Sequence, residues 1–306
     1  MEKRGKILVI RGGAIGDFIL TLPAIAAVRE QFPDAHLEVL GYPHIVQLAV
    51  ASELVDRAQS IDAGPLAGFF ARNGTLHPGL VEYFAGFSLI ISYLFDPDEI
   101  FRTNVGRCTK AQFIVCPHRP NERESTHAAQ VYLKPLERLA IFGASAQPRL
   151  AIGALPGATN QIALHPGSGS EKKNWPEAKW SQLIARLLQA TNYHLLIVGG
   201  EAEGERLQRL AAALPPSRVR VAQSLPLVDL ARVLRGSAAF VGHDSGISHL
   251  AAALGVPGLV LWGDTNDQIW RPPQSQVVVL KNQFGLNGIG VEQVLESLTG
   301  LFSARV

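Results

Sequence analysis

Cysteine is nearly absent from this sequence, with Cys108 and Cys116 the two among 306 residues. Two cysteines are too few for a disulfide-stabilised scaffold, and they lack the spacing and the partner residues of a zinc site. We therefore expect both to be small apolar residues of a protein in a reducing compartment.

Long apolar runs are also missing. A helix that spans a bilayer needs about 18 or more largely uncharged apolar residues in a row, and the sequence has no such window. The basic and apolar residues of 3–10 imitate a signal peptide, but Arg11 and Asp17 interrupt the apolar region too early. The sequence therefore predicts a soluble protein made in the cytoplasm.

Neither sign of charge dominates. The 28 Lys and Arg residues face 26 Asp and Glu residues, which argues against a general affinity for nucleic acid. A length of 306 residues with 47% hydrophobic residues leaves room for two ordinary domains, each with its own core.

The first half alternates strand and helix patterns. KILVI (6–10) is a short apolar run that ends in glycines, and residues 17–32 repeat apolar side chains at helical spacing. HLEVLGY (36–42) and LIISYLF (89–95) are further apolar runs between Gly and Pro punctuation. This order predicts a parallel sheet covered by helices.

The same alternation restarts after a segment rich in Pro, Gly and small residues at 144–160. QIALHPGSG (161–169) opens this half with a strand that runs into a glycine-containing turn. The further strands expected are 193–200, 219–222, 238–244 and 258–263, and the helices are 176–190, 203–214, 227–236 and 247–255. We predict an α/β protein of two doubly wound, Rossmann-like domains, 1–152 and 153–306, that face each other across a cleft. Ligands of such sheets bind beyond the carboxyl ends of the strands.

The first strand is followed by RGGAIGD (11–17), which resembles a phosphate-binding turn. The dinucleotide pattern G-x-G-x-x-G fits at Gly13 and Gly16, but Arg11 stands where its first glycine belongs. Glu38 lies inside the second strand, so that strand does not end on the acid that would bind a ribose. The pattern argues against a nicotinamide enzyme.

Asp17 changes the chemistry of this turn. A carboxylate in the first turn of a helix repels the pyrophosphate that the same N-terminus would attract. Asp17 is then either a helix cap or a base that accepts a proton from a bound hydroxyl.

Two stretches of the second half have the features of an anion site. HPGSGSEKKNWP (165–176) offers backbone N–H groups, the hydroxyls of Ser168 and Ser170, and the ammonium groups of Lys172 and Lys173. The alternative is a solvated loop, because the full P-loop pattern is absent.

The second of these stretches is VGHDSGISHLAAALG (241–255). Asp244 and Ser245 fall at a predicted helix start, where Gly246 permits the close approach of a diphosphate. His249 either faces the ligand or has a structural role, and His243 and His249 lack the i, i+4 spacing of a helical metal pair.

Two further features bear on metals and on acceptors. Asp96 and Asp98 form a D-x-D pattern that holds a divalent metal in some sugar transferases, but Pro97 between them favours a turn. We expect neither a metal nor a bound cofactor. The residues between 102 and 123 are locally basic, which suits an anionic glycolipid, although a solvated loop is the alternative. Its basic residues are Arg102, Arg107, Lys110, Arg119 and Arg123, against Glu122.

Taken together, four ordered blocks resemble the family 9 glycosyltransferases, the lipopolysaccharide heptosyltransferase-like proteins. The blocks are KILVIRGGAIGDFILTLPAIAAVRE, ALHPGSGSEKKNWPEAKWSQLI, LLIVGGEAEGERL and AAFVGHDSGISHLAAALGVPGLVLWGDT. The resemblance implies a GT-B fold, with the acceptor bound by the first domain and a nucleotide sugar by the second. It also implies inversion of the sugar without a metal, with ADP-heptose the best single donor.

The resemblance also implies roles for individual residues. Asp17 is the catalytic base, Lys173 contacts the donor phosphates, and Glu203 holds the nucleotide ribose. The remaining expected contacts are Ser168, Asp244, Ser245, Gly246 and His249 for the donor, and Gly13, Arg102, Arg107, Arg119 and Arg123 for the acceptor. Such an enzyme would meet its lipid at the inner face of the cytoplasmic membrane, though no clear amphipathic anchor is present.

Two other functions stay open at this point. Fold alone does not fix the reaction, so a nucleotide-sugar 2-epimerase on the same scaffold is one alternative. The other is a non-catalytic protein that binds sugar nucleotides or glycans, in which Asp17 would be a cap.

Overall fold

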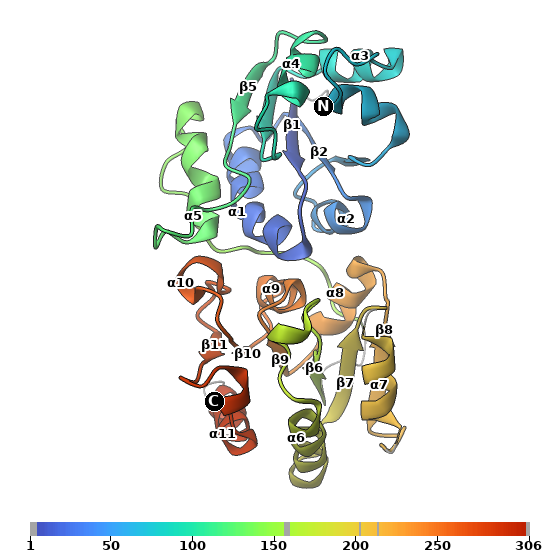
Figure 1. The fold of residues 1–306 in the computed structure, drawn as a ribbon, viewed down its shortest axis with the longest axis vertical. Helices are drawn as coiled ribbons and strands as arrows, with labels where there is room; N and C mark the ends of the chain where they lie inside the picture. Colours follow the sequence, from blue (N-terminus) through green and yellow to red (C-terminus); the bar gives the residue numbers. More distant parts are fainter. Residues whose placement is uncertain (1–4, 156–159, 202, 213, 304–306) are drawn as a thin grey trace. The chain divides into compact units, whose positions relative to one another are not determined.

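The computed structural model describes residues 5–155, 160–201, 203–212 and 214–303, which divide into two compact units, Met1–Ala146 and Gln147–Val306 (Figure 1). The sequence placed the division slightly later, at 152/153. Residues just after 146 pack with the second unit, where Leu150 N–H donates to Ala253 O at 2.9 Å and Gln274 Nε2 donates to Pro148 O at 2.8 Å.

The first unit has a five-stranded sheet in the order β3-β2-β1-β4-β5, and every pair in it is parallel. Its strands are β1 (Lys6–Arg11), β2 (His36–Gly41), β3 (Arg57–Ser60), β4 (Leu89–Ser92) and β5 (Gln112–Val115). Its helices are α1 (Ile15–Gln31), α2 (Pro43–Ala51), α3 (Pro78–Ala85), α4 (Ile100–Gly106) and α5 (Ala128–Leu133), with 3₁₀ turns η1 (Gly64–Phe70) and η2 (Lys134–Leu139).

Strand β1 lies at the centre of this sheet, between β2 and β4. The chain leaves β1 toward β2 on one side and later reaches β4 on the other, so the carboxyl end of β1 is the point where the strand order reverses. Helix α1 packs against α2 and α5, whereas η1, α3 and α4 contribute to a separate aromatic-rich core with β1 and β4. The turn after β1 is therefore where a ligand is expected in this unit.

The second unit has a six-stranded parallel sheet in the order β11-β10-β9-β6-β7-β8. Its strands are β6 (Gln161–Leu164), β7 (His194–Gly199), β8 (Val219–Gln223), β9 (Ala239–His243), β10 (Gly258–Leu261) and β11 (Val277–Leu280). Its helices are α6 (Glu177–Ala190), α7 (Gly204–Ala211), α8 (Leu227–Arg235), α9 (Gly246–Ala253), α10 (Asp267–Trp270) and α11 (Val291–Ser303), with 3₁₀ turns η4 (Glu171–Lys173) and η5 (Leu286–Gly288).

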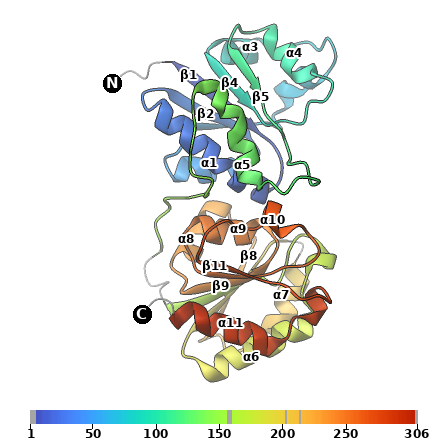
Figure 2. The ribbon, with the colours of Figure 1, turned by 90° about the vertical axis from the view of Figure 1, so that its left-hand side faces the viewer.

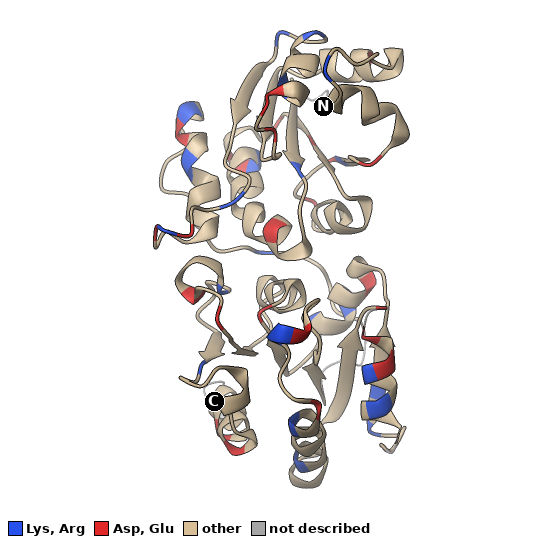
Figure 3. Cartoon of the chain, viewed as in Figure 1, with Lys and Arg blue, Asp and Glu red and all other residues tan. Residues whose placement is uncertain are grey.

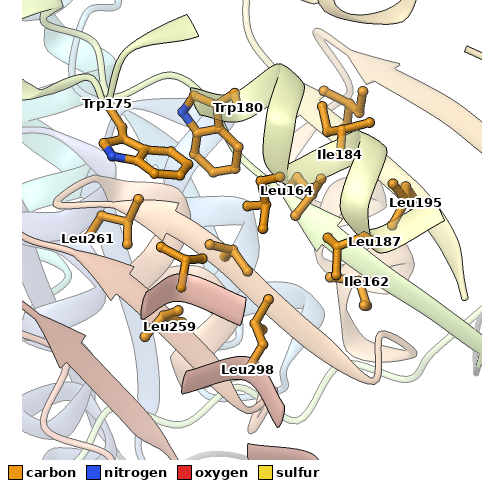
Figure 4. Packing of buried hydrophobic residues seen from close by; sticks show 14 of the residues in the cluster. Ile162, Leu164, Trp175, Trp180, Ile184, Leu187, Leu195, Leu259, Leu261 and Leu298 are labelled. Atoms are coloured by element: carbon orange, nitrogen blue, oxygen red, sulfur yellow. The ribbon is translucent and has the colours of Figure 1, made fainter. Parts of the chain in front are cut away.

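Alternate residues of the central strands point to a core under α6, α7 and α11. Ile162 and Leu164 of β6 belong to it, as do the buried indoles of Trp175 and Trp180, which lie side by side at one end of the cluster (Figure 4). Helices α8 and α9 lie on the other side of the sheet (Figure 2). Strands β6 and β9 are neighbours, so the loops that follow them begin side by side.

The strands and helices expected from the sequence are confirmed, with ends that differ by a few residues. Strands β3, β5 and β11 were missed, and each lies at an edge of its sheet. Edge strands bury less surface, and RAQS of β3 shows no apolar run at all. Across the ranges that the structure describes, none of the helices combines the length and the apolar character needed to cross a membrane.

Candidate active site

The turn between β1 and α1 presents Asp17 at the central switch point of the first sheet. Gly13 has φ +98°, a conformation that favours glycine, and a Cβ there would lie 3.0 Å from Asp17 Oδ2. That oxygen accepts the N–H of Ala14 at 3.1 Å, so Asp17 does cap the helix. The side chain is nevertheless 30% exposed, which leaves it accessible to a bound hydroxyl.

Arg11, which sequence reasoning treated as a misfit in a glycine pattern, organises this turn. Its side chain is 2% exposed, and its guanidinium donates to His118 O at 2.8 Å and to Tyr93 O at 3.3 Å. It also donates to Asp17 O at 3.3 Å, lies 3.7 Å from Asp17 Oδ1 and stacks over the Tyr132 ring at 4.7 Å. Arg11 therefore holds the Asp17 carboxylate in place, because its guanidinium is bonded to Tyr93, which follows β4, and to His118, which follows β5.

A pocket of about 470 Å³ opens in front of Asp17, with Arg11 and Gly13 also in its lining. Tyr42, Phe70 and Phe95 line it as well, with exposed fractions of 38%, 43% and 65%. Aromatic walls around a few polar groups are typical of small-ligand sites. The pocket thus combines a carboxylate with apolar surfaces against which a sugar ring can pack.

His118 lines the same pocket, and sequence reasoning missed it. Its ring centroid lies 4.6 Å from that of Phe95. Burial, followed by the charges of Arg11 and Arg119, lowers the pKa of His118. The lowered pKa favours the neutral imidazole, which can both donate and accept a hydrogen bond.

The basic residues expected to bind the acceptor do not converge. Arg119 lines the pocket and pairs with Glu122 at 2.5 Å. Arg102 pairs with Glu99, and Arg107 donates to Gly74 O at 3.0 Å; neither lines the pocket. Arg123 is exposed and also lies outside the lining. Figure 3 shows basic and acidic positions interspersed in each unit.

In the second unit, two sequence blocks meet where β6 and β9 end. Lys173 Nζ, on the loop after β6, lies 2.6 Å from Asp244 Oδ2, which directly follows β9. Ser245 begins α9 by accepting the N–H of Ser248, and Gly246 is the first residue of that helix. An ammonium group therefore lies at the start of this helix, where it offsets the charge of the Asp244 carboxylate that would otherwise repel an anion from the helix N-terminus.

Residues 165–176, which we call the β6–α6 loop, are held by their own contacts and by α7. Glu203, the residue before α7, packs against this loop so closely that its side chain leaves no room for a Cβ on Gly167, and it accepts the N–H of Gly200 at 2.9 Å. The Ser168 hydroxyl lies 2.7 Å from Asn174 Oδ1. Arg206 of α7 bonds both carboxylate oxygens of Glu171.

Three histidines lie near this loop and α9. His165 is buried, which lowers its pKa to about 4, and its Nδ1 lies 3.3 Å from Ser245 Oγ. His243 is also buried and bonds the loop directly. His249 is 5% exposed, so its ring offers little surface to a ligand, and its role in donor binding stays a prediction.

The D-x-D aspartates have local roles. Asp96 accepts the N–H groups of Phe101 and Arg102 at 3.1 and 2.9 Å, and so caps α4. Asp98 lies 3.5 Å from Arg72 on the surface. These contacts agree with the turn expected from Pro97.

Comparison with known proteins identifies the family. The model of glycosyltransferase family 9 (heptosyltransferase) matches residues 130–291. Lipopolysaccharide heptosyltransferase 1 of Pseudomonas aeruginosa is 44% identical over 111 residues, which is 36% of this chain and 30% of that protein. The aligned part therefore spans less than a third of this relative's length.

Solved structures show the fold. The glycosyl transferase family 9 protein of Veillonella parvula has a TM-score of 0.79 at 20% identity, with 99% of each chain covered. The Escherichia coli heptosyltransferase WaaC with ADP has a TM-score of 0.76 at 20% identity, with 97% of this chain and 99% of that chain covered. The predicted GT-B fold class is confirmed.

Proposed function

The chain belongs to glycosyltransferase family 9, the heptosyltransferase family, and from that premise we propose that it transfers a sugar from a nucleoside diphosphate donor to a hydroxyl of a lipopolysaccharide-type acceptor. The second unit binds the donor and the first unit binds the acceptor.

The contact between Lys173 and Asp244, 2.6 Å long, carries this proposal. It places an ammonium group at the start of α9, where it compensates the Asp244 carboxylate and leaves the positive end of the helix dipole available to an anion. When the bond between sugar and diphosphate breaks, negative charge grows on the departing oxygen. Lys173 and the helix N-terminus stabilise that charge, a function that a metal ion serves in other transferases.

Asp17 acts on the acceptor. The acceptor oxygen attacks the anomeric carbon from the face opposite the diphosphate, the glycosidic bond forms as the bond to the diphosphate breaks, and Asp17 takes the hydroxyl proton. The product then has the opposite anomeric configuration to the donor. Support comes from the exposed part of the carboxylate and from the buried Arg11, which holds it in one orientation.

The proposed donor is ADP-heptose, and the proposed acceptor is an anionic glycolipid core at the cytoplasmic face of the membrane. Both assignments are supported by the relative named lipopolysaccharide heptosyltransferase 1 and by the likeness to WaaC with ADP. Arg119 is the basic residue of 102–123 that lines the Asp17 pocket, so it is the best placed of these residues for an acidic group.

A thermal-shift screen with ADP, UDP, GDP and CDP tests the donor assignment. A ligand that binds only the folded state raises its stability by mass action. ADP should raise the melting temperature more than the other three nucleotides at equal concentration. A selective response to UDP or GDP would contradict the ADP assignment, and the absence of any response would contradict the nucleotide site itself.

A further inference from the structure

His243 joins the two ends of the β6–α6 loop. It is the last residue of β9, and its ring is fully buried. The backbone N–H of Trp175 donates to His243 Nε2 at 2.8 Å, and His243 Nδ1 lies 3.1 Å from Gly167 O. One imidazole therefore connects the start of the loop to its end, through main-chain groups that any loop sequence would provide.

The two contacts require one particular form of the ring. Because Nε2 accepts a hydrogen bond, Nδ1 carries the proton and donates it to the carbonyl of Gly167. Burial lowers the pKa of His243 to about 3, so the neutral ring is retained in ordinary buffers. An imidazolium would direct an N–H at the Trp175 N–H and lose that contact.

Lys173 lies between the two fixed points. Its N–H donates to Ser170 O at 3.0 Å, within the short turn η4, and its ammonium group reaches Asp244, the residue next to His243. The end of β9 thus contacts the loop twice: the His243 ring bonds its backbone, and Asp244 pairs with Lys173. The Lys173 side chain is 42% exposed and gains no rigidity from burial, so its placement depends on the loop backbone and on the ion pair with Asp244.

We infer that His243 is a positioning residue that holds the β6–α6 loop so that the Lys173 ammonium rests over the N-terminus of α9, where it meets the donor diphosphate. This inference rests on the proposed donor site. It assigns to His243 an effect on donor affinity that is exerted through Lys173, without contact between the imidazole and the donor.

A double-mutant cycle on ADP affinity, measured by titration calorimetry, tests the inference. In His243→Asn the amide nitrogen replaces Nδ1 and keeps the bond to Gly167 O, but the Trp175 N–H loses its acceptor. ADP affinity should fall about 3- to 10-fold, the size of one neutral hydrogen bond. In a Lys173→Ala background, His243→Asn should lower ADP affinity by less than about twofold, because His243 acts on the donor only through Lys173. His243→Gln, whose amide oxygen replaces Nε2, should restore most of the affinity.

The outcomes separate this inference from the proposed function. If Lys173→Ala by itself leaves ADP affinity unchanged, the donor site is wrong. If Lys173→Ala weakens binding but His243→Asn lowers affinity equally in both backgrounds, the donor site stands and the positioning role of His243 is refuted.

A second measurement uses the unmodified protein, so it does not depend on whether a variant folds. The ¹⁵N chemical shifts of the His243 ring in the unmodified protein should show a neutral Nδ1–H tautomer at pH 6. A doubly protonated ring, or a proton on Nε2, would overturn the inference, because Nε2 would then have no lone pair for the Trp175 N–H.

Discussion

Asp17→Asn should lower the rate of sugar transfer by about 10²- to 10⁴-fold, the usual contribution of a positioned general base. The asparagine oxygen can still accept the Ala14 N–H, which Asp17 Oδ2 accepts at 3.1 Å, so α1 should keep its start and the protein its stability. The variant loses only the ability to take a proton. ADP affinity should be unchanged, because the proposed nucleotide site lies in the second unit.

The matched control is Asp34→Asn, an exposed aspartate in the turn that follows the same helix. It should leave both transfer and ADP affinity unchanged. Turnover measured by ADP release, together with calorimetric ADP binding, covers both properties. If Asp17→Asn transfers sugar at the rate of the unmodified protein, Asp17 is a helix cap and another group is the base.

Lys173→Ala should weaken ADP binding by about 10- to 100-fold. A hydrogen bond to a charged group contributes about 1.5–3 kcal/mol, and about 1.4 kcal/mol corresponds to a tenfold change in affinity. The side chain is 42% exposed, so screening by salt favours the lower end of that range. Removal of the ammonium would also leave the Asp244 carboxylate, which it contacts at 2.6 Å, without its cation at the proposed diphosphate site.

Lys172→Ala is the control for this substitution, because it removes the same charge from the neighbouring, exposed residue. Calorimetric titration at low and at high salt should show a large loss for Lys173→Ala and little change for Lys172→Ala. Equal losses in both variants would mean that general charge attraction, and not a specific contact, binds the nucleotide.

The sequence alone predicted the strands and helices whose residues form a clear local pattern. Buried parallel strands such as β7 and β9 are continuous apolar runs, and glycines and capping residues mark the turns after them. The missed edge strands are short and partly exposed: β3 (RAQS) has no apolar run at all, and β5 (QFIV) and β11 (VVVL) have runs of only three and four apolar residues. They become visible only when the neighbouring strand provides the pairing.

In the candidate site, too, residues with a local sequence pattern were predictable and residues that depend on distant partners were not. Asp17 and Asp244 stand next to strand ends and helix starts, so local pattern singled them out, whereas the choice of Lys173 over Lys172 came from the resemblance to the family. The roles of Arg11 and His243 depend on partners distant in sequence. Arg11 bonds carbonyls 82 and 107 residues away, and His243 bonds Trp175, 68 residues away. Only the strand order brings these groups together, and sequence periodicity does not determine that order.

The most direct test of the account is the anomeric configuration of the product. The protein would be incubated with ADP-heptose and a lipopolysaccharide core that lacks heptose, and the one-bond carbon–hydrogen coupling at the new anomeric centre would be measured by NMR. A single displacement with Asp17 as base predicts a configuration opposite to that of the donor. A product with the donor's configuration would contradict it.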